Sequence, residues 1–108
     1  MAKKVLGQVN PSATTLTTLY TVPSAKEAVV SSISVANLTA TAATFRLAVR
    51  PAGEAIANKH YIGYDITVRA SDSTIITVGL TLATTDVLSV YASTANVAFQ
   101  AFGDEASV

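Results

Sequence analysis

The sequence contains a single histidine, His60, which is the only imidazole available for general acid–base chemistry. A catalytic histidine needs a nucleophile and an orienting acid beside it. The usual motifs that supply such groups are missing: there is no G-x-S-x-G elbow, no H-E-x-x-H pair and no glycine-rich phosphate loop. We therefore expect His60 to be an edge or interface residue at the start of a strand, and the protein not to be an enzyme.

The carboxylates are dispersed along the chain. Asp72 and Asp86 lie in turn-like sequences, where a carboxylate accepts hydrogen bonds from nearby backbone N–H groups. Asp104 and Glu105 are adjacent, so an extended chain points them to opposite faces. The D-x-D-x-D-G spacing of a calcium loop is missing, and a chain without cysteine has no thiolate ligand. We therefore expect no metal site and no cofactor.

Basic and aromatic side chains offer two kinds of contact. Arg46, Arg50 and Lys59 could together hold a phosphate or a carboxylate, although solvent-facing or intersubunit ion pairs are the simpler expectation. Tyr61 and Tyr91 fall on the expected outer faces of their strands, and exposed tyrosine is enriched at interfaces. A saccharide-binding platform remains an alternative, and the residues available for it are Tyr61, Tyr91, Asp65 and Asn58.

The composition is that of a neutral, apolar chain. Its 108 residues include seven Lys or Arg and seven Asp or Glu, and 50% are hydrophobic while 13% are charged. A disordered chain would carry more charge and fewer β-branched residues. A nucleic-acid binder would be basic overall or would carry a basic stripe. We therefore expect one folded domain that does not bind nucleic acid.

The first residues raise the question of a targeting signal. Lys3 and Lys4 resemble the start of a signal peptide, but the apolar stretch that follows consists of Val5 and Leu6 alone. No segment approaches the roughly 18 apolar residues of a membrane span. We expect the protein to be made in a cytoplasm, to have no membrane contact, and to stay there or be assembled there into a larger particle.

Period-two alternation of β-branched residues predicts strands over residues 15–22, 28–37, 44–50, 60–69, 74–80, 87–92 and 97–102. Residues 5–9 would add an edge strand. The one stretch with helical propensity, residues 54–59, is long enough for a single turn. Short strands spaced about 8–12 residues apart are typical of a sandwich or a small barrel. The expected fold is all-β, a single β-sandwich, jelly-roll or Ig-like, with seven or eight mostly antiparallel strands.

The same alternation predicts which side chains are buried. In residues 44–50, the expected inner face consists of Phe45, Leu47 and Val49. In residues 60–69, it consists of the even-numbered residues Ile62, Tyr64, Ile66 and Val68.

We divide the chain into an N-terminal arm (residues 1–13), a β-sandwich domain (residues 14–103) and a C-terminal tail (residues 104–108). Ala, Val and Thr dominate the expected core, which contains no Trp, so a domain of this size has a modest stability margin. Few charged residues are available on its strand surfaces to prevent contact with other chains. These features favour a homo-oligomer, with a stable monomer bearing threonine-rich faces as the alternative.

Several segments together resemble a known group of proteins. They are residues 19–23 (LYTVP), 45–53 (FRLAVRPAG), 59–65 (KHYIGYD), 80–94 (LTLATTDVLSVYAST) and 99–103 (FQAFG). The pattern is similar to small β-sandwich virion structural proteins of tailed bacteriophages, and it runs over nearly the whole chain. That group carries no catalytic motif, so the resemblance transfers no functional residue.

The resemblance implies a virion protein, first of all a capsid decoration or cement protein. Such a subunit would form a homo-oligomer, which we expect to be a trimer, and would stabilise the head by bridging subunits of the major capsid protein. One alternative is a tail, neck or fibre-associated component that contacts tail proteins. Another is a carbohydrate- or receptor-binding module displayed on the virion.

Overall fold

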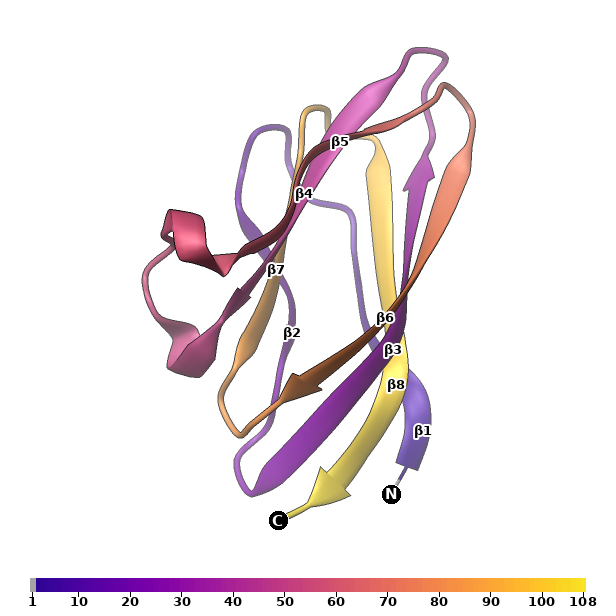
Figure 1. Cartoon of the computed structure of the whole chain (residues 1–108). Coiled ribbons are helices and arrows are strands. Elements are labelled where there is room, and N and C mark those ends of the chain that lie inside the picture. Colours follow the sequence, from indigo (N-terminus) through magenta and orange to yellow (C-terminus); the bar gives the residue numbers. More distant parts are fainter. Residues whose placement is uncertain (1) are drawn as a thin grey trace.

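The computed structural model describes residues 2–108 as strands joined by short loops (Figure 1). Its eight strands are β1 (Ala2–Val9), β2 (Thr17–Thr21), β3 (Lys26–Asn37), β4 (Ala43–Arg50), β5 (Tyr61–Val68), β6 (Ser73–Leu82), β7 (Val87–Ala92) and β8 (Val97–Ser107). Two short 3₁₀ turns, η1 (Pro51–Gly53) and η2 (Asn58–His60), lie between β4 and β5. The predicted all-β class is confirmed.

The strands form two four-stranded antiparallel sheets that pack as a sandwich. Sheet A has the order β1-β8-β3-β6, and sheet B has the order β2-β7-β4-β5. The pairs β1–β8, β2–β7, β3–β6 and β4–β5 are nested, as in one long hairpin rolled up until β3 also meets β8 and β4 also meets β7. This is the strand order of a jelly roll, so the Ig-like alternative is excluded.

The core lies between the sheets. Phe45 of β4 and Phe99 of β8 are fully buried and meet edge to face, with ring centroids 6.0 Å apart. Leu47 is buried and Val49 packs against the same core, which confirms the inner face predicted for β4. Because only a few large rings fill it, the core relies on close packing of Val, Ile, Leu and Ala side chains.

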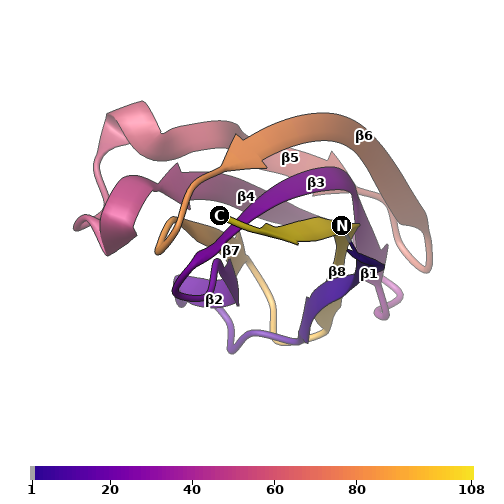
Figure 2. The ribbon, with the colours of Figure 1, turned by 90° about the horizontal axis from the view of Figure 1, so that it is seen from below.

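The rolled hairpin gives the sandwich two different lateral sides. Figure 2 shows β1 and β2 at one side and β5 and β6 at the other. These are the edge strands of the two sheets, so each side presents one edge of sheet A and one of sheet B. The two sides differ in how their edge strands are covered, and this difference decides which side is open to contact with another molecule.

Both ends of the chain differ from the expected arm and tail. Residues 2–9, within the expected arm, form β1 and pair with β8, which confirms the edge strand expected over residues 5–9 and extends it to Ala2. Strand β8 continues to Ser107, through most of the expected tail, and lies between β1 and β3. The predicted strand ended at residue 102, but Gly103 continues β8 and permits close packing, since a Cβ at this position would lie 2.0 Å from the carbonyl oxygen of Val29.

The inner face predicted for β5 is wrong at Ile62 and Tyr64, which are exposed; Val68 is buried as expected. Two irregularities in the β4–β5 register cause this, because each extra residue turns the following side chains to the other face. Ile66 pairs with Phe45 and so lies toward the inner side, but it remains 39% exposed at the edge of its sheet.

The helical turn expected over residues 54–59 is also wrong for most of its length. Residues 54–57 have no regular structure, and only η2 (Asn58–His60) forms a turn, of the 3₁₀ type. The segment instead spans from the end of β4 to the start of β5 as a loop that carries its own polar network. That network fixes the surroundings of His60.

Candidate functional site

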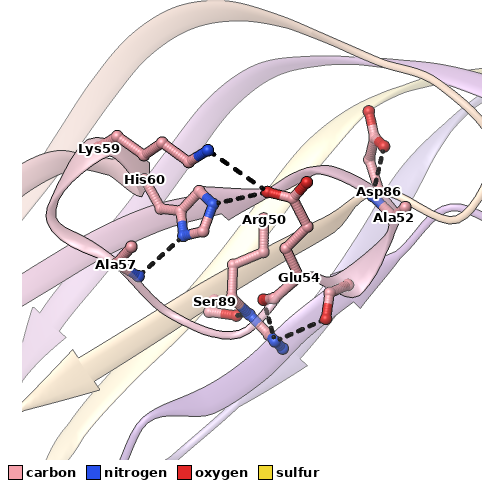
Figure 3. Close-up of polar contacts among 9 residues, drawn as sticks. Arg50, Ala52, Glu54, Ala57, Lys59, His60, Asp86 and Ser89 are labelled. Atoms are coloured by element: carbon pink, nitrogen blue, oxygen red, sulfur yellow. Dashed lines mark hydrogen bonds and ion pairs between the residues drawn. The ribbon is translucent and has the colours of Figure 1, made fainter.

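The loop between β4 and β5 is tied down onto sheet B (Figure 3). The Arg50 guanidinium donates to Ser89 Oγ on β7 at 3.1 Å and to the carbonyl oxygens of Gly53 and Glu54 at 3.3 and 2.9 Å. Ser89 is fully buried on β7, an interior strand of the sheet. Arg50 therefore serves as an internal brace for the loop and not as a free cation for a ligand.

His60 is the second anchor of this loop. Its ring is only 5% exposed; Nδ1 accepts a hydrogen bond from the Ala57 N–H at 3.0 Å, and Nε2 lies 3.1 Å from Glu54 Oε1 (Figure 3). Since Nδ1 accepts, the Nε2 hydrogen is the one directed at the carboxylate. Both nitrogens thus hold the loop, and His60 is a buried loop anchor and not the edge or interface residue that we expected.

The turn roles predicted for Asp72 and Asp86 are confirmed. Asp72 Oδ1 accepts from the Ser73 N–H at 2.8 Å. Asp86 uses both oxygens, accepting from the Ala52 N–H at 3.0 Å and from the Ala83 N–H at 2.9 Å. Among residues 2–108, no three His, Asp or Glu side chains come close enough to one another to hold a metal ion.

A cluster of aromatic and charged side chains covers the outer face of sheet B beside this loop. We call it the tyrosine–arginine cluster, and it consists of Arg46, Tyr61, Tyr64, Asp65 and Tyr91. The guanidinium of Arg46 lies 4.1 Å from the ring centroid of Tyr64 and 4.2 Å from that of Tyr91. Tyr61 meets Tyr64 edge to face, with centroids 5.0 Å apart. These are favourable cation–π and aromatic geometries.

Asp65 holds the cation of this cluster in place. Its Oδ1 accepts from Arg46 Nε at 2.7 Å, and its Oδ2 accepts more weakly from Nη2 at 3.5 Å. The hydrogen bond to Asp65 raises the pKa of Arg46 above its already high ordinary value. Asp65 reaches this position with a backbone φ of 51°, at the second irregularity of β5. The unusual backbone thus directs β5 toward the arginine.

A shallow hollow of about 350 Å³ lies at the rim of the cluster, lined by Asn58, Tyr61 and Tyr64. Tyr64 forms an open wall of this hollow, with 57% of the residue exposed. The structure therefore brings together the four residues that the sequence offered for a saccharide platform. Sequence reasoning missed Tyr64, because strict alternation placed it inside, and the signal that could have corrected this is the unfavourable fit of Gly63 and Asp65 within a strand.

The three basic residues considered for an anion site do not converge. Arg46 is paired with Asp65 and Arg50 with Ser89 and the loop carbonyls, as described above. Lys59 Nζ lies 4.0 Å from Glu54 Oε1 and is largely exposed. Arg46 and Lys59 thus form ion pairs within the chain, as expected, whereas Arg50 donates to neutral oxygens; none of the three is directed at a common phosphate or carboxylate site.

A separate polar site lies at the β1/β2 side of the sandwich. Glu105, only 9% exposed, accepts a hydrogen bond from the Tyr20 hydroxyl at 2.5 Å and pairs with Lys4 Nζ at 3.0 Å. Tyr20 and Lys4 stabilise the carboxylate and lower its pKa, while burial and the nearby carboxylate raise the pKa of Tyr20. The sequence did not predict this site, because it joins residues from three strands that are distant in the chain.

No family model matches the chain, and no curated protein and no solved structure matches it either. None of the helical turns within residues 2–108 is long and apolar enough to cross a membrane. The functional argument therefore depends on the surfaces of this molecule itself.

Proposed function

We propose that this protein is a structural, non-enzymatic subunit of a bacteriophage virion, and specifically a capsid decoration protein. It would form a homo-oligomer and stabilise the head by bridging subunits of the major capsid protein. Three things support this: the resemblance of its sequence to small phage virion proteins, the jelly-roll strand order that viral capsid domains also use, and an unguarded lateral side. The last of these carries the proposal.

The β5/β6 side is apolar and almost without charge. Ile62 and Ile66 on β5 are 48% and 39% exposed. Across from them, β6 contains no charged residue from Ser73 to Leu82, and its inward-facing residues Ile76, Val78 and Leu80 are only partly buried. Monomeric proteins usually protect an edge strand with charges, proline or a covering segment. An edge of ten residues without such protection suits contact with another subunit.

The proposed mechanism is mechanical. Oligomers would bury the β5/β6 side against a neighbouring copy, which removes apolar surface from water and provides partners for the free backbone groups of the edge strands. A bound oligomer that touches several capsid subunits adds contacts that must break before the head expands or ruptures. The lattice of the head would supply the matching repeated sites.

The oligomer is tested by the double variant Ile62→Lys/Thr77→Lys, which places one cation on each strand of this side. Sedimentation of the unmodified protein should give a compact oligomer, for which we expect a trimer, and the double variant should sediment as a folded monomer. The matched control is Val5→Lys, because Val5 is 46% exposed on β1, at the opposite lateral side. An oligomer that survives the double variant would rule out the β5/β6 contact.

The place in the virion is tested by the copy number of this chain in purified particles, measured by quantitative mass spectrometry against the major capsid protein. A decoration protein should be present at about one copy per capsid subunit, or at a simple lattice fraction of that number. A handful of copies would instead support the neck, tail or fibre alternative. Absence from the particle would refute the virion proposal.

A further inference from the structure

We infer that the tyrosine–arginine cluster and the hollow beside it bind a neutral saccharide. This goes beyond the proposed role in the head and does not depend on it. The inference follows from three properties of the site: the rings are already fixed in place, its charge is balanced within the chain, and polar groups line an open aromatic wall.

The rings are fixed before any ligand arrives. Arg46 lies against both Tyr64 and Tyr91, and Asp65 holds its guanidinium, so that each ring is restrained from one side. Tyr61 restrains Tyr64 further through the edge-to-face contact. A binding site in this state loses little side-chain freedom when it is occupied, which matters most for weak ligands with few strong contacts.

The electrostatics favour an uncharged ligand. The charge of Arg46 is balanced by Asp65, whose carboxylate takes the Nε donor at 2.7 Å. An anionic ligand would have to compete with Asp65 for this guanidinium, and a cationic ligand on the open face of Tyr64 would be repelled by Arg46 on its other face. A sugar meets neither obstacle, because its C–H face can pack on an aromatic ring while its hydroxyls bond to neutral donors and acceptors.

The hollow supplies those donors and acceptors. The Asn58 amide offers both, and the hydroxyls of Tyr61 and Tyr64 can act in either role. At about 350 Å³ the hollow is at the lower end of the range for small-molecule sites. An open site of this size fits one or two sugar units of a longer chain, held with a dissociation constant on the order of a millimolar.

Tyrosine and arginine also dominate protein–protein hot spots, so a protein partner is the competing occupant. The observations favour the sugar. The surface is hollowed where Tyr64 is exposed, and the arginine that would anchor a protein partner has already given its Nε donor to Asp65.

The test is a ¹H–¹⁵N NMR titration of the whole chain with maltohexaose, cellohexaose, chitohexaose and mannohexaose, each to about 10 mM. At least one of them should shift the amides of residues 58–65. The anionic trisaccharide sialyllactose should shift them less. Tyr64→Ala should weaken the binding at least tenfold, Asn58→Ala severalfold, and Tyr64→Phe by less than Tyr64→Ala because it keeps the ring.

Ile75→Ala is the matched control, because Ile75 is 70% exposed on β6 of the other sheet, and it should leave the titration unchanged. The amide spectrum of Tyr64→Ala shows whether the variant is folded, and Tyr64→Phe tests the ring if it is not. Failure of all four neutral sugars to shift residues 58–65 would overturn the inference. Stronger binding of sialyllactose, or unchanged binding by Tyr64→Ala, would overturn it as well.

Discussion

The two lateral sides of the sandwich consist of the same elements, one edge strand from each sheet, but they are completed in different ways. At the β1/β2 side the sheets approach each other until backbone meets backbone: a Cβ on Gly7 would lie 2.0 Å from the carbonyl oxygen of Leu19. The Lys4–Glu105–Tyr20 contacts add a polar clamp at the same side. This side is closed by the chain itself.

The β5/β6 side has neither device. A Cβ on its β5 glycine, Gly63, would be crowded only by the movable tip of Ile66, with Leu47 at ordinary contact distance, and the inward-facing residues of β6 stay partly exposed. In this molecule, the side that carries more charged residues is also the side that is more tightly closed. The side with lysines and a buried carboxylate is closed by the chain itself, whereas the side whose β6 strand carries no charge leaves apolar surface that a second subunit can cover.

The largest expected effect comes from adding one methyl group at each side. Gly7→Ala should lower the free energy of unfolding by about 3 kcal/mol, because the new Cβ meets backbone that cannot move aside. Gly63→Ala should cost less than about 1 kcal/mol, because Ile66 Cδ1, at 2.8 Å from the added Cβ, can rotate away. Urea unfolding of both variants measures the difference. Equal costs would mean that the two sides are equally closed.

The next effect comes from removing the acid of the polar clamp. Glu105→Ala should cost about 2 kcal/mol, because the buried Tyr20 hydroxyl is left without a partner. The control is Asp65→Asn on β5, which removes the charge of a half-exposed carboxylate and keeps a residue type that tolerates the positive φ of this position, so it should cost less than about 1 kcal/mol. A smaller loss for Glu105→Ala than for Asp65→Asn would show that the clamp does not close the β1/β2 side.

Sequence reasoning succeeded where a strand is regular and failed where it is not. The alternation of β4 identified Phe45 and Leu47 as core residues, because nothing interrupts the inward sequence of that strand. In β5, two register irregularities moved Tyr64 to the outer face, and alternation alone carries no information about them. The residues of the tyrosine–arginine cluster were thus partly predicted, but the contact between Arg46 and Tyr64 was not.

Pairing between strands that are far apart in the sequence was the second feature that sequence reasoning could not predict. The sequence of β1 shows weak alternation and two lysines, so it predicted only a short edge strand over residues 5–9 within an N-terminal arm. It becomes a strand because β8 offers it a long partner, and Lys4 finds Glu105 although 101 positions separate them in the chain. The clamp could not be predicted, since each of its members has an ordinary role when its own segment is considered alone.

The clamp should also make stability depend on pH. The folded protein holds the pKa of Glu105 below its ordinary value of 4.5, so the contribution of the clamp is complete above pH 4.5. As the pH falls, the unfolded chain takes up the proton first, and the contribution is lost through the lowered folded pKa. Urea unfolding between about pH 6 and pH 3 should therefore show a smaller acid loss for Glu105→Gln than for the unmodified protein. Equal slopes would mean that other carboxylates cause the acid response.

The smallest effect is expected at the open side. Ile62→Ala should change the stability of the dilute monomer by less than about 1 kcal/mol, because this residue is 48% exposed and has little packing to lose. Ile33→Ala is the control for a fully buried isoleucine and should cost about 2–5 kcal/mol. If the β5/β6 side is covered by another copy, the cost of Ile62→Ala must grow with protein concentration, because the covered surface then contributes to the stability of the oligomer. Unfolding measured over a wide concentration range separates the two cases: a small cost at all concentrations would mean that this side stays exposed and that the oligomer, if it forms, uses another surface.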